Sequence, residues 1–251
     1  MIDIHTHVMP GVDDGAKNMR MALEMIEKSY SEGVDTVIAT PHCMPGVYNN
    51  IFNESLAKKW NTLYQTVKEE GIPVHLRKGM EVLINDRSMR LIKEKKVWTL
   101  NNTDYLLVEF AFDEDPAWCT EKLKEVSSLG YIPIIAHPER YDCVQAHREI
   151  VYDWYSLGYG IQVNKESLLG QFGRKEKQTA DSLLRHNIVT CVASDAHRID
   201  RRTPGMKDIF EYLNDRYGGE YTHMLTKANP SRIVNGKPMV GYKAIPYEYE
   251  E

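Results

Sequence analysis

Histidines and carboxylates recur in this sequence directly after short stretches of apolar residues. His5 and His7 occur as His-Thr-His after one such stretch, and Asp195 and His197 occur as Ser-Asp-Ala-His after another. Imidazole nitrogens and carboxylate oxygens are common ligands of divalent transition metals, so their repetition at one kind of position indicates a metal site. The candidate ligands are His5, His7, Asp14, His42, Glu81, Glu109, His137, Asp195 and His197.

This set of ligands is too large for a single ion. A lone catalytic zinc takes three or four ligands, whereas a shared carboxylate such as Glu81 can bridge two ions about 3.5–4 Å apart. Of the adjacent aspartates in Asp13-Asp14-Gly15, we take Asp14 as the ligand. We expect two or three divalent ions, manganese first, with iron or zinc as alternatives, because imidazole is present and no thiolate is offered.

Such ions favour hydrolysis of a phosphate ester. A bound divalent ion lowers the pKa of water from about 16 to about 7, which supplies a hydroxide for in-line attack on phosphorus. The phosphate oxygens then need cationic partners, and a guanidinium matches them in geometry. The candidates are Arg140, three residues after His137 in His-Pro-Glu-Arg, and Arg202, five residues after His197, with Arg201 a competitor for the second role.

Other phosphate chemistries find no support in the sequence. A cysteine-dependent phosphatase needs an arginine six positions after its nucleophile, and none of the four cysteines has one. No Gly-x-x-x-x-Gly-Lys loop and no Gly-x-Gly-x-x-Gly fingerprint is present. The cysteines also form no C-x-x-C pair, which excludes a zinc knuckle of that type. They are Cys43, Cys119, Cys143 and Cys191.

The elements that must position these residues alternate between two patterns. Stretches rich in β-branched residues predict seven strands, at 2–5, 34–40, 74–81, 105–110, 132–136, 160–164 and 188–194. Helical periodicity predicts helices at 21–31, 53–70, 120–129, 149–157 and 175–185. Where a helix ends before a strand, a left-handed cap is expected at Gly33, Gly71, Gly130 and Gly158.

Alternation of strand and helix favours a mainly parallel sheet covered by helices, either an open sheet or a closed barrel. Both architectures bind ligands beyond the carboxyl ends of their strands, which is where the candidate ligands stand. The length of 251 residues and the lack of a linker predict one domain over 1–251. A helix start is expected at Asn229, and residues 242–251 are expected to form a mobile acidic tail.

Composition excludes several classes of protein. With 31 basic against 36 acidic residues and a net charge of −5, nucleic-acid binding is disfavoured. No apolar run approaches the roughly 18 residues of a membrane span. The first residues, Met1-Ile2-Asp3-Ile4-His5, lack the features of a signal peptide, so we expect a cytoplasmic protein without membrane insertion.

These motifs resemble the polymerase-and-histidinol-phosphatase (PHP) superfamily, and most closely the bacterial manganese-dependent tyrosine phosphatases of capsule and exopolysaccharide synthesis (CpsB/CapC type). The resemblance covers nearly the whole chain. It is carried by His5-Thr6-His7, Asp13-Asp14-Gly15, Thr40-Pro41-His42, Gly79-Met80-Glu81, His137-Pro138-Glu139-Arg140-Tyr141, Ser194-Asp195-Ala196-His197 and the segment after Asn229.

The resemblance implies a distorted (β/α)7 TIM-like barrel, a three-metal cluster, and action on the phosphotyrosine tail of a membrane-associated bacterial kinase that controls polysaccharide export. The family's ligands match all nine candidates above, and its phosphate-binding arginines match Arg140 and Arg202. The first helix departs from the pattern, because Asn18-Met19-Arg20 stands where the family has acidic residues. The resemblance therefore leaves open whether this chain forms the ring-like homo-oligomer of the family.

Two alternatives remain at the level of sequence. The first is another phosphomonoesterase on the same site, such as a histidinol-phosphate phosphatase, since a metal cluster recognises only the phosphate. The second is a non-catalytic metal-binding regulatory module, which the complete ligand set disfavours.

Overall fold

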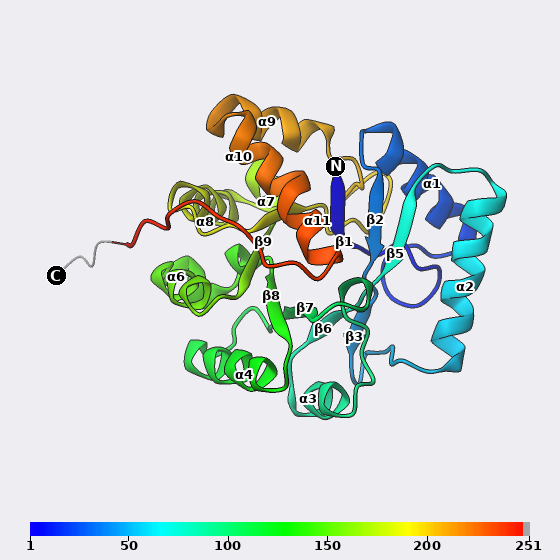
Figure 1. Cartoon of the computed structure of the whole chain (residues 1–251), viewed down its shortest axis with the longest axis horizontal. Coiled ribbons are helices and arrows are strands. Elements are labelled where there is room, and N and C mark those ends of the chain that lie inside the picture. Colours follow the sequence, from blue (N-terminus) through cyan, green and yellow to red (C-terminus); the bar gives the residue numbers. More distant parts are fainter. Residues whose placement is uncertain (248–251) are drawn as a thin grey trace.

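The structure, a computed structural model, describes residues 1–247 and alternates short strands with helices (Figure 1). The strands are β1 (Ile2–Thr6), β2 (Thr36–Ala39), β3 (His42–Met44), β4 (Tyr48–Asn49), β5 (His75–Lys78), β6 (Glu81–Leu83), β7 (Tyr105–Glu109), β8 (Ile132–Ala136), β9 (Gly160–Asn164) and β10 (Cys191–Ala193). The helices are α1 (Met19–Ser31), α2 (Glu54–Glu69), α3 (Asp86–Lys93), α4 (Pro116–Ser128), α5 (Asp142–Ala146), α6 (Glu149–Ser156), α7 (Lys165–Leu169), α8 (Arg174–Arg185), α9 (Lys207–Tyr217), α10 (Gly219–His223) and α11 (Asn229–Val234).

The strands occupy seven positions around a barrel. β10, β9, β8, β7, β6 and β3 pair in that order and in parallel, and β1, β2 and β5 form a second parallel set. The backbone N–H of Asp195 donates to the carbonyl of His5, and that of His7 to the carbonyl of Ala196, both at 2.8 Å, which joins β10 to β1. The predicted distorted (β/α)7 TIM-like barrel is confirmed.

Two barrel positions hold a broken strand, which the sequence did not predict. At the first of these positions, Thr40-Pro41 separates β2 from β3, because proline has no N–H to donate to a ladder. At the second position, Gly79-Met80 separates β5 from β6. A Cβ on Gly79 would lie 2.8 Å from the Leu100 side chain. Leu100 belongs to a 3₁₀ turn, Leu100–Asn102, that contacts both β5 and β7 and so distorts the barrel.

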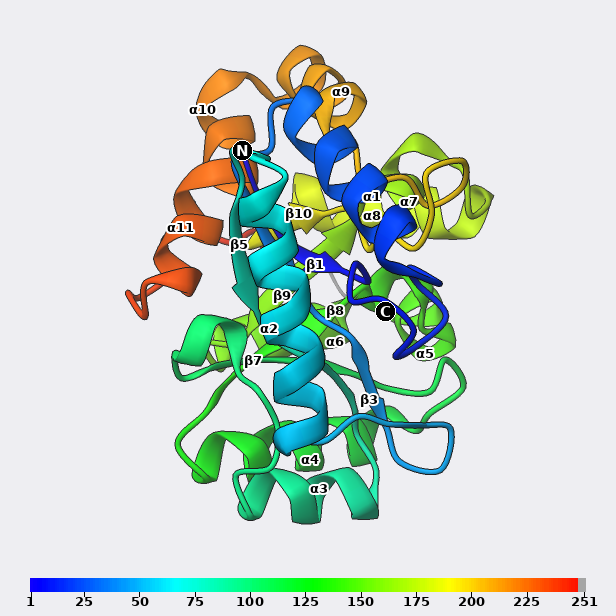
Figure 2. The same ribbon diagram turned by 90° about the vertical axis from the view of Figure 1, so that its right-hand side faces the viewer.

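The predicted helices are present with ends shifted by at most four residues, and α11 begins at the expected Asn229. The four predicted cap glycines have φ angles of +90°, +68°, +90° and +87°, as expected for left-handed caps. Figure 2 shows α1 and α2 on the outside of the barrel, on the side of β1 and β5. Helices α1 and α2 thus cover the sides of these strands.

Apolar side chains fill both sides of the strands. One buried cluster lies between strands and helices and includes Val37, Val108 and Val163. The other includes Ile38, Leu107 and Ile134, which alternate with that set along their strands and so point to the opposite face. The barrel interior is therefore packed, and the polar site must lie at one end of it.

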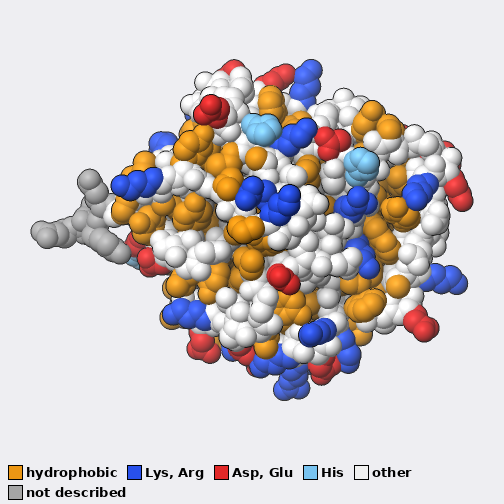
Figure 3. All heavy atoms as spheres, viewed as in Figure 1, with side chains coloured by type: hydrophobic (Ala, Val, Ile, Leu, Met, Phe, Trp, Pro, Cys, Tyr) orange, Lys and Arg blue, Asp and Glu red, His pale blue; other side chains and the backbone are white. Residues whose placement is uncertain are grey.

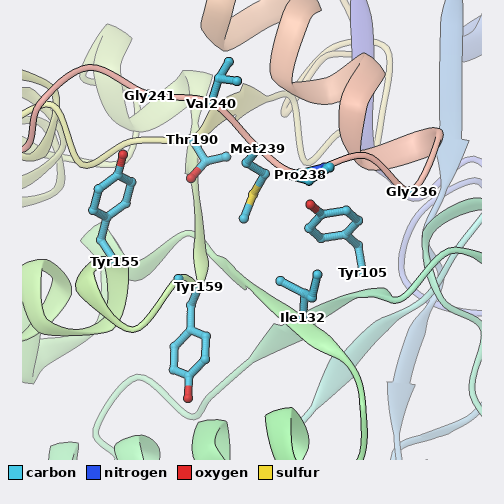
Figure 4. A pocket seen from close by; sticks show the side chains of 11 residues that line it. Tyr105, Ile132, Tyr155, Tyr159, Thr190, Gly236, Pro238, Met239, Val240 and Gly241 are labelled. Carbon is cyan, nitrogen blue, oxygen red and sulfur yellow. The ribbon is translucent and has the colours of Figure 1, made fainter.

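The amino end of the barrel is covered by the segment that follows α11. A cavity of about 420 Å³ remains there between Tyr105, Ile132 and Met239 (Figure 4). The Tyr105 hydroxyl donates to the carbonyl of Lys237 at 2.8 Å. Tyr105 and Ile132 are the first residues of their strands, so this cavity lies opposite the end that bears the candidate ligands.

The C-terminal segment contacts α8 as far as it is described. The Ile245 N–H donates to the carbonyl of His186 at 2.9 Å, and the Tyr247 ring stacks on the His186 ring at 3.7 Å. The acidic residues Glu248, Glu250 and Glu251 of the predicted mobile tail lie outside the described residues.

The face viewed in Figure 1 mixes basic, acidic and apolar side chains (Figure 3). Within residues 1–247, no helix combines the length and the hydropathy that a bilayer crossing requires.

Candidate metal centre

The candidate ligands converge at the carboxyl end of the barrel although they come from six barrel positions. Their donor atoms form three overlapping groups in which all atoms lie within 4.8 Å of one another. His7, His42 and Glu81 each belong to two groups, so the groups adjoin one another, and the carboxylate of Glu81 could be shared between neighbouring ions. The groups are His7, Asp14, His42 and His197; His5, His7, Glu81 and Asp195; and His42, Glu81 and Glu109.

His137, the ninth candidate, lies at the edge of these groups. Its Nε2 is 2.9 Å from a carboxylate oxygen of Glu81 and 3.7 Å from one of Glu109. The structure thus brings all nine predicted residues to one place.

Several buried donor atoms at this centre have no hydrogen-bond partner among the described residues. They include Nδ1 of His42, Nε2 of His197 and one carboxylate oxygen each of Glu81, Glu109 and Asp195. An unsatisfied buried polar atom costs about 1–3 kcal/mol, so a cluster of such atoms at one point favours a bound ligand. Divalent cations fit this donor set, which is rich in imidazole and carboxylate and contains no thiolate.

The electrostatics of the cluster also favour cations. Burial alone would raise the pKa of Glu81 and lower that of His5, yet the opposite shifts are found because imidazoles and carboxylates face one another. His5 Nε2 lies 3.1 Å from Glu81 and 3.4 Å from Asp195. Protons on the imidazoles or divalent ions at the centre are the two ways to neutralise these buried carboxylates.

His197 behaves differently from the other histidines. Burial and the nearby His7 lower its pKa to about 4. Its Nδ1 lies 2.9 Å from the carbonyl of Asp195, and its Nε2 lies 3.5 Å from Asp14. A neutral imidazole held by its second nitrogen in this way is the form that binds a metal.

Three polar residues that orient the candidate ligands were not predicted. Asp13 accepts from the backbone N–H of His42 at 3.0 Å and lies 2.9 Å from Nδ1 of His7. The Gln162 side-chain oxygen lies 2.8 Å from Nδ1 of His5, and the Asn164 amide donates to Asp195 at 2.7 Å. Gln162 and Asn164 alternate with apolar residues in Gly-Ile-Gln-Val-Asn, a signal of inward-facing polar side chains.

Backbone strain accompanies the site. His137, Asp195 and Arg202 have φ angles of +36°, +49° and +51°, in the left-handed region that non-glycine residues rarely adopt. His137 and Asp195 turn the chain just after β8 and β10, and Arg202 does so in the loop between β10 and α9. Such strain persists where the surrounding structure enforces it. The fold therefore holds these side chains in fixed directions.

Both predicted arginines border the candidate metal centre. Arg202 forms an ion pair with Asp195, and Arg140 lies 3.7 Å from the same carboxylate. The backbone N–H of His197 donates to the carbonyl of Arg202 at 2.9 Å, which fixes the loop. The competing candidate, Arg201, has an exposed side chain and makes no ion pair with a described residue.

Comparison with known proteins identifies the family. Residues 1–235 match the family described as capsular polysaccharide synthesis, CpsB/CapC. This chain belongs to the CpsB/CapC family. Its relatives include tyrosine-protein phosphatase YwqE of Bacillus subtilis, 34% identical over 90% of this chain and 89% of that protein. Tyrosine-protein phosphatase CpsB of Streptococcus pneumoniae is 29% identical over 93% of this chain and 98% of that protein.

Solved structures agree with this family assignment. One of the crystal structures of YwqE from Bacillus subtilis and CpsB from Streptococcus pneumoniae superposes on this chain with a TM-score of 0.91 at 31% identity. Those two proteins are described as metal-dependent tyrosine phosphatases. The superposition covers 99% of this CpsB/CapC-family chain and 100% of the chain in that crystal structure. The lactonase Lmo2620 of Listeria monocytogenes, with a TM-score of 0.62 at 11% identity, shares the fold alone.

Proposed function

We propose that this chain is a metal-dependent protein-tyrosine phosphatase that hydrolyses phosphotyrosine by attack of water-derived hydroxide on phosphorus. The observation that carries the proposal is the convergence of three overlapping groups of mostly buried imidazoles and carboxylates beside two arginines. Relatives named as tyrosine-protein phosphatases over about nine-tenths of the chain support the same activity.

The nine candidate residues are proposed to hold two or three divalent ions, with manganese first and iron or zinc as alternatives. Such ions, when bound, lower the pKa of water and neutralise phosphate charge. The three groups would hold up to three ions, and Glu81, whose carboxylate has two oxygens, is the residue that could be shared between neighbours. His137 is proposed to complete the third group, beside Glu81 and Glu109.

Arg140 and Arg202 are proposed to bind the non-bridging oxygens of the phosphate. Both guanidinium groups lie beside the same carboxylate, that of Asp195. A bound phosphate would supply a further anion for these two cations. Asp13, Gln162 and Asn164 keep the imidazoles and Asp195 in orientation through the hydrogen bonds described above. This chain thus contributes binding, orientation and charge, while a phenolate of pKa about 10 departs without needing a strong acid.

The substrate is proposed to be phosphotyrosine on a bacterial tyrosine kinase that regulates capsule or exopolysaccharide synthesis. The capsular polysaccharide description of the family and the names of the relatives support this choice. They favour it over histidinol phosphate, which the metal centre alone does not distinguish. With manganese present, a phosphotyrosyl peptide should be turned over far better than histidinol phosphate, and the opposite ranking would contradict the proposal.

A second experiment separates an enzyme from a metal-binding regulatory module. His42→Ala or Asp195→Ala should abolish hydrolysis of a generic aryl phosphate while circular dichroism shows an unchanged fold. Asp153→Ala, a change at an exposed position of α6, is the matched control and should retain activity. Failure of the unchanged protein to hydrolyse any aryl phosphate with manganese, iron or zinc would favour the regulatory module.

A further inference from the structure

Two phenylalanines surround the proposed phosphate-binding Arg140. Its guanidinium carbon lies 4.5 Å from the ring centroid of Phe112 and 4.6 Å from that of Phe172. Arg202 lies 5.9 Å from the Phe172 ring, so Phe172 contacts both arginines. A guanidinium within about 6 Å of an aromatic face is held there by the ring quadrupole.

The two rings come from different loops at the carboxyl end of the barrel. Phe112 follows β7, and its carbonyl accepts the N–H of Asp142 at 2.8 Å. Phe172 stands in a short loop between Gly170 and Gly173, whose φ angles of +81° and +137° reverse the chain between α7 and α8. Glycine tolerates these angles without strain, so the loop can project Phe172 toward the arginines.

The rings do more than support the arginine. Phe112 keeps 42% of its surface exposed although one side contacts Arg140. Its ring also lies edge-on to the proposed ligand His137, with centroids 6.1 Å apart at 82°. An exposed apolar ring thus lies directly beside the proposed metal and phosphate groups.

The ester oxygen of a bound phosphate has one direction open to it. His5 and Glu81 are fully buried and close the inner side of the metal centre. The substituent on the ester oxygen must therefore extend toward the mouth, where Phe112 lies. A phenyl ring there gains apolar burial and edge-to-face contacts, whereas a short alkyl chain gains little.

We propose that Phe112 and Phe172 are specificity-determining residues that contact the phenyl ring of the substrate and favour aryl over alkyl phosphates. The inference rests on the proposed function, because it concerns the substrate of the same site. It adds a reason for phosphotyrosine preference that a metal centre recognising only phosphate cannot supply.

The test measures binding of two phosphonates that cannot be hydrolysed. Isothermal titration calorimetry of the manganese-loaded protein gives the dissociation constants of phenylphosphonate and methylphosphonate. We expect the unchanged protein to bind phenylphosphonate at least tenfold more tightly. Phe112→Leu and Phe172→Leu should each reduce this ratio about three- to tenfold, whereas Phe172→Tyr should keep it.

Controls separate ring contact from support of Arg140. Loss of support alone weakens both phosphonates equally and leaves their ratio unchanged, so an unchanged ratio in both leucine variants would overturn the proposal. Phe52→Leu is the matched control, because Phe52 is 51% exposed and packs on Trp98. Turnover of a phosphotyrosyl peptide on the same samples reports the proposed function separately.

Discussion

Asp13 and Asp14 are adjacent in the chain, yet their carboxylates face different partners. Asp14 points to His42 and His197 within the candidate ligand groups, whereas Asp13 lies behind His7. A hydrogen bond to the second nitrogen of a ligating imidazole fixes its tautomer and direction. Asp14 thus remains the proposed ligand of the pair, and Asp13 the residue that orients His7.

Asp13→Ala should weaken manganese binding about 10–100-fold without abolishing it, because His7 loses the partner that orients it. Calorimetric titration of metal-free protein with manganese measures this affinity. Asp153→Ala is again the matched control and should bind as the unchanged protein does. An unchanged affinity in Asp13→Ala would show that His7 needs no such support.

Glu166 gives stability a pH dependence of its own. Burial raises its pKa to about 8, against the pull of Lys165, whose ammonium lies 3.8 Å away. The folded protein therefore binds a proton that an unfolded glutamate, of pKa 4.5, releases. This contribution to stability is full below pH 4.5 and is lost as pH rises toward about 8, at up to about 1.4 kcal/mol per pH unit.

Glu166→Gln cannot ionise and should make the free energy of unfolding fall less steeply between pH 5 and pH 8. Urea unfolding at several pH values, with chelator present so that metal binding adds no pH dependence, measures the difference. Parallel curves for the variant and the unchanged protein would show that Glu166 is ionised in the folded state.

At the scale of elements, α7 fixes the loop that carries Arg202. The buried ammonium of Lys165, the first residue of α7, donates to the Thr203 hydroxyl at 3.0 Å and to the carbonyl of Gly205. On the other side of the loop, the backbone carbonyl of Arg202 accepts a hydrogen bond from the N–H of His197. The position of Arg202, a proposed phosphate-binding group, therefore depends on a helix that lies outside the proposed phosphate site.

Lys165→Met should raise the dissociation constant for inorganic phosphate about tenfold, because the loop bearing Arg202 loses its anchor, while manganese affinity stays the same. Calorimetry with each ligand measures both. Lys122→Met on α4, where the lysine pairs with Glu125, is the control. An equal effect in the control, or a parallel loss of manganese binding, would contradict the role of Lys165.

The sequence predicted the order and type of elements well because hydrophobic periodicity and glycine caps are local signals. It predicted single strands at 34–40 and 74–81, and these boundaries were wrong. The interruption at Gly79 involves the Leu100 side chain, which lies 21 residues further along the chain, whereas the proline at the first interruption is a local signal that the prediction overlooked. A contact of that kind leaves no trace in the local pattern.

The same limit applies to the candidate site. Its nine candidate ligands could be predicted because each chemically distinctive residue follows an apolar strand. Asp13, Gln162 and Asn164 could not be assigned, because their roles depend on which imidazole or carboxylate they meet across the barrel. Phe112 and Phe172 likewise become neighbours only when the barrel brings β7 and α7 to the same end.

At the scale of the whole molecule, the fold gathers five histidines and four carboxylates from distant parts of the chain. Without cations, these groups stabilise one another only through protonation. Metal that binds the folded chain and not the unfolded chain should therefore stabilise the folded state. At a manganese concentration of 100 times the dissociation constant, one site adds about 2.7 kcal/mol.

Manganese should accordingly raise the thermal unfolding midpoint by about 5–10 °C, and chelator should reverse the shift. Differential scanning fluorimetry at increasing manganese concentration measures it. His42→Ala and Asp195→Ala should show a smaller shift. A midpoint that is insensitive to manganese and chelator would mean that the gathered side chains do not bind the ion.

The central claim is that several ions held together at the carboxyl end of the barrel hydrolyse phosphotyrosine. Its most direct test is a titration of chelator-stripped protein with manganese, in which bound metal per chain and turnover of a phosphotyrosyl peptide are measured on the same samples. The account predicts that activity appears only as the bound metal approaches two or three ions per chain. Full activity with one ion or none, or no activity at full occupancy, would contradict it.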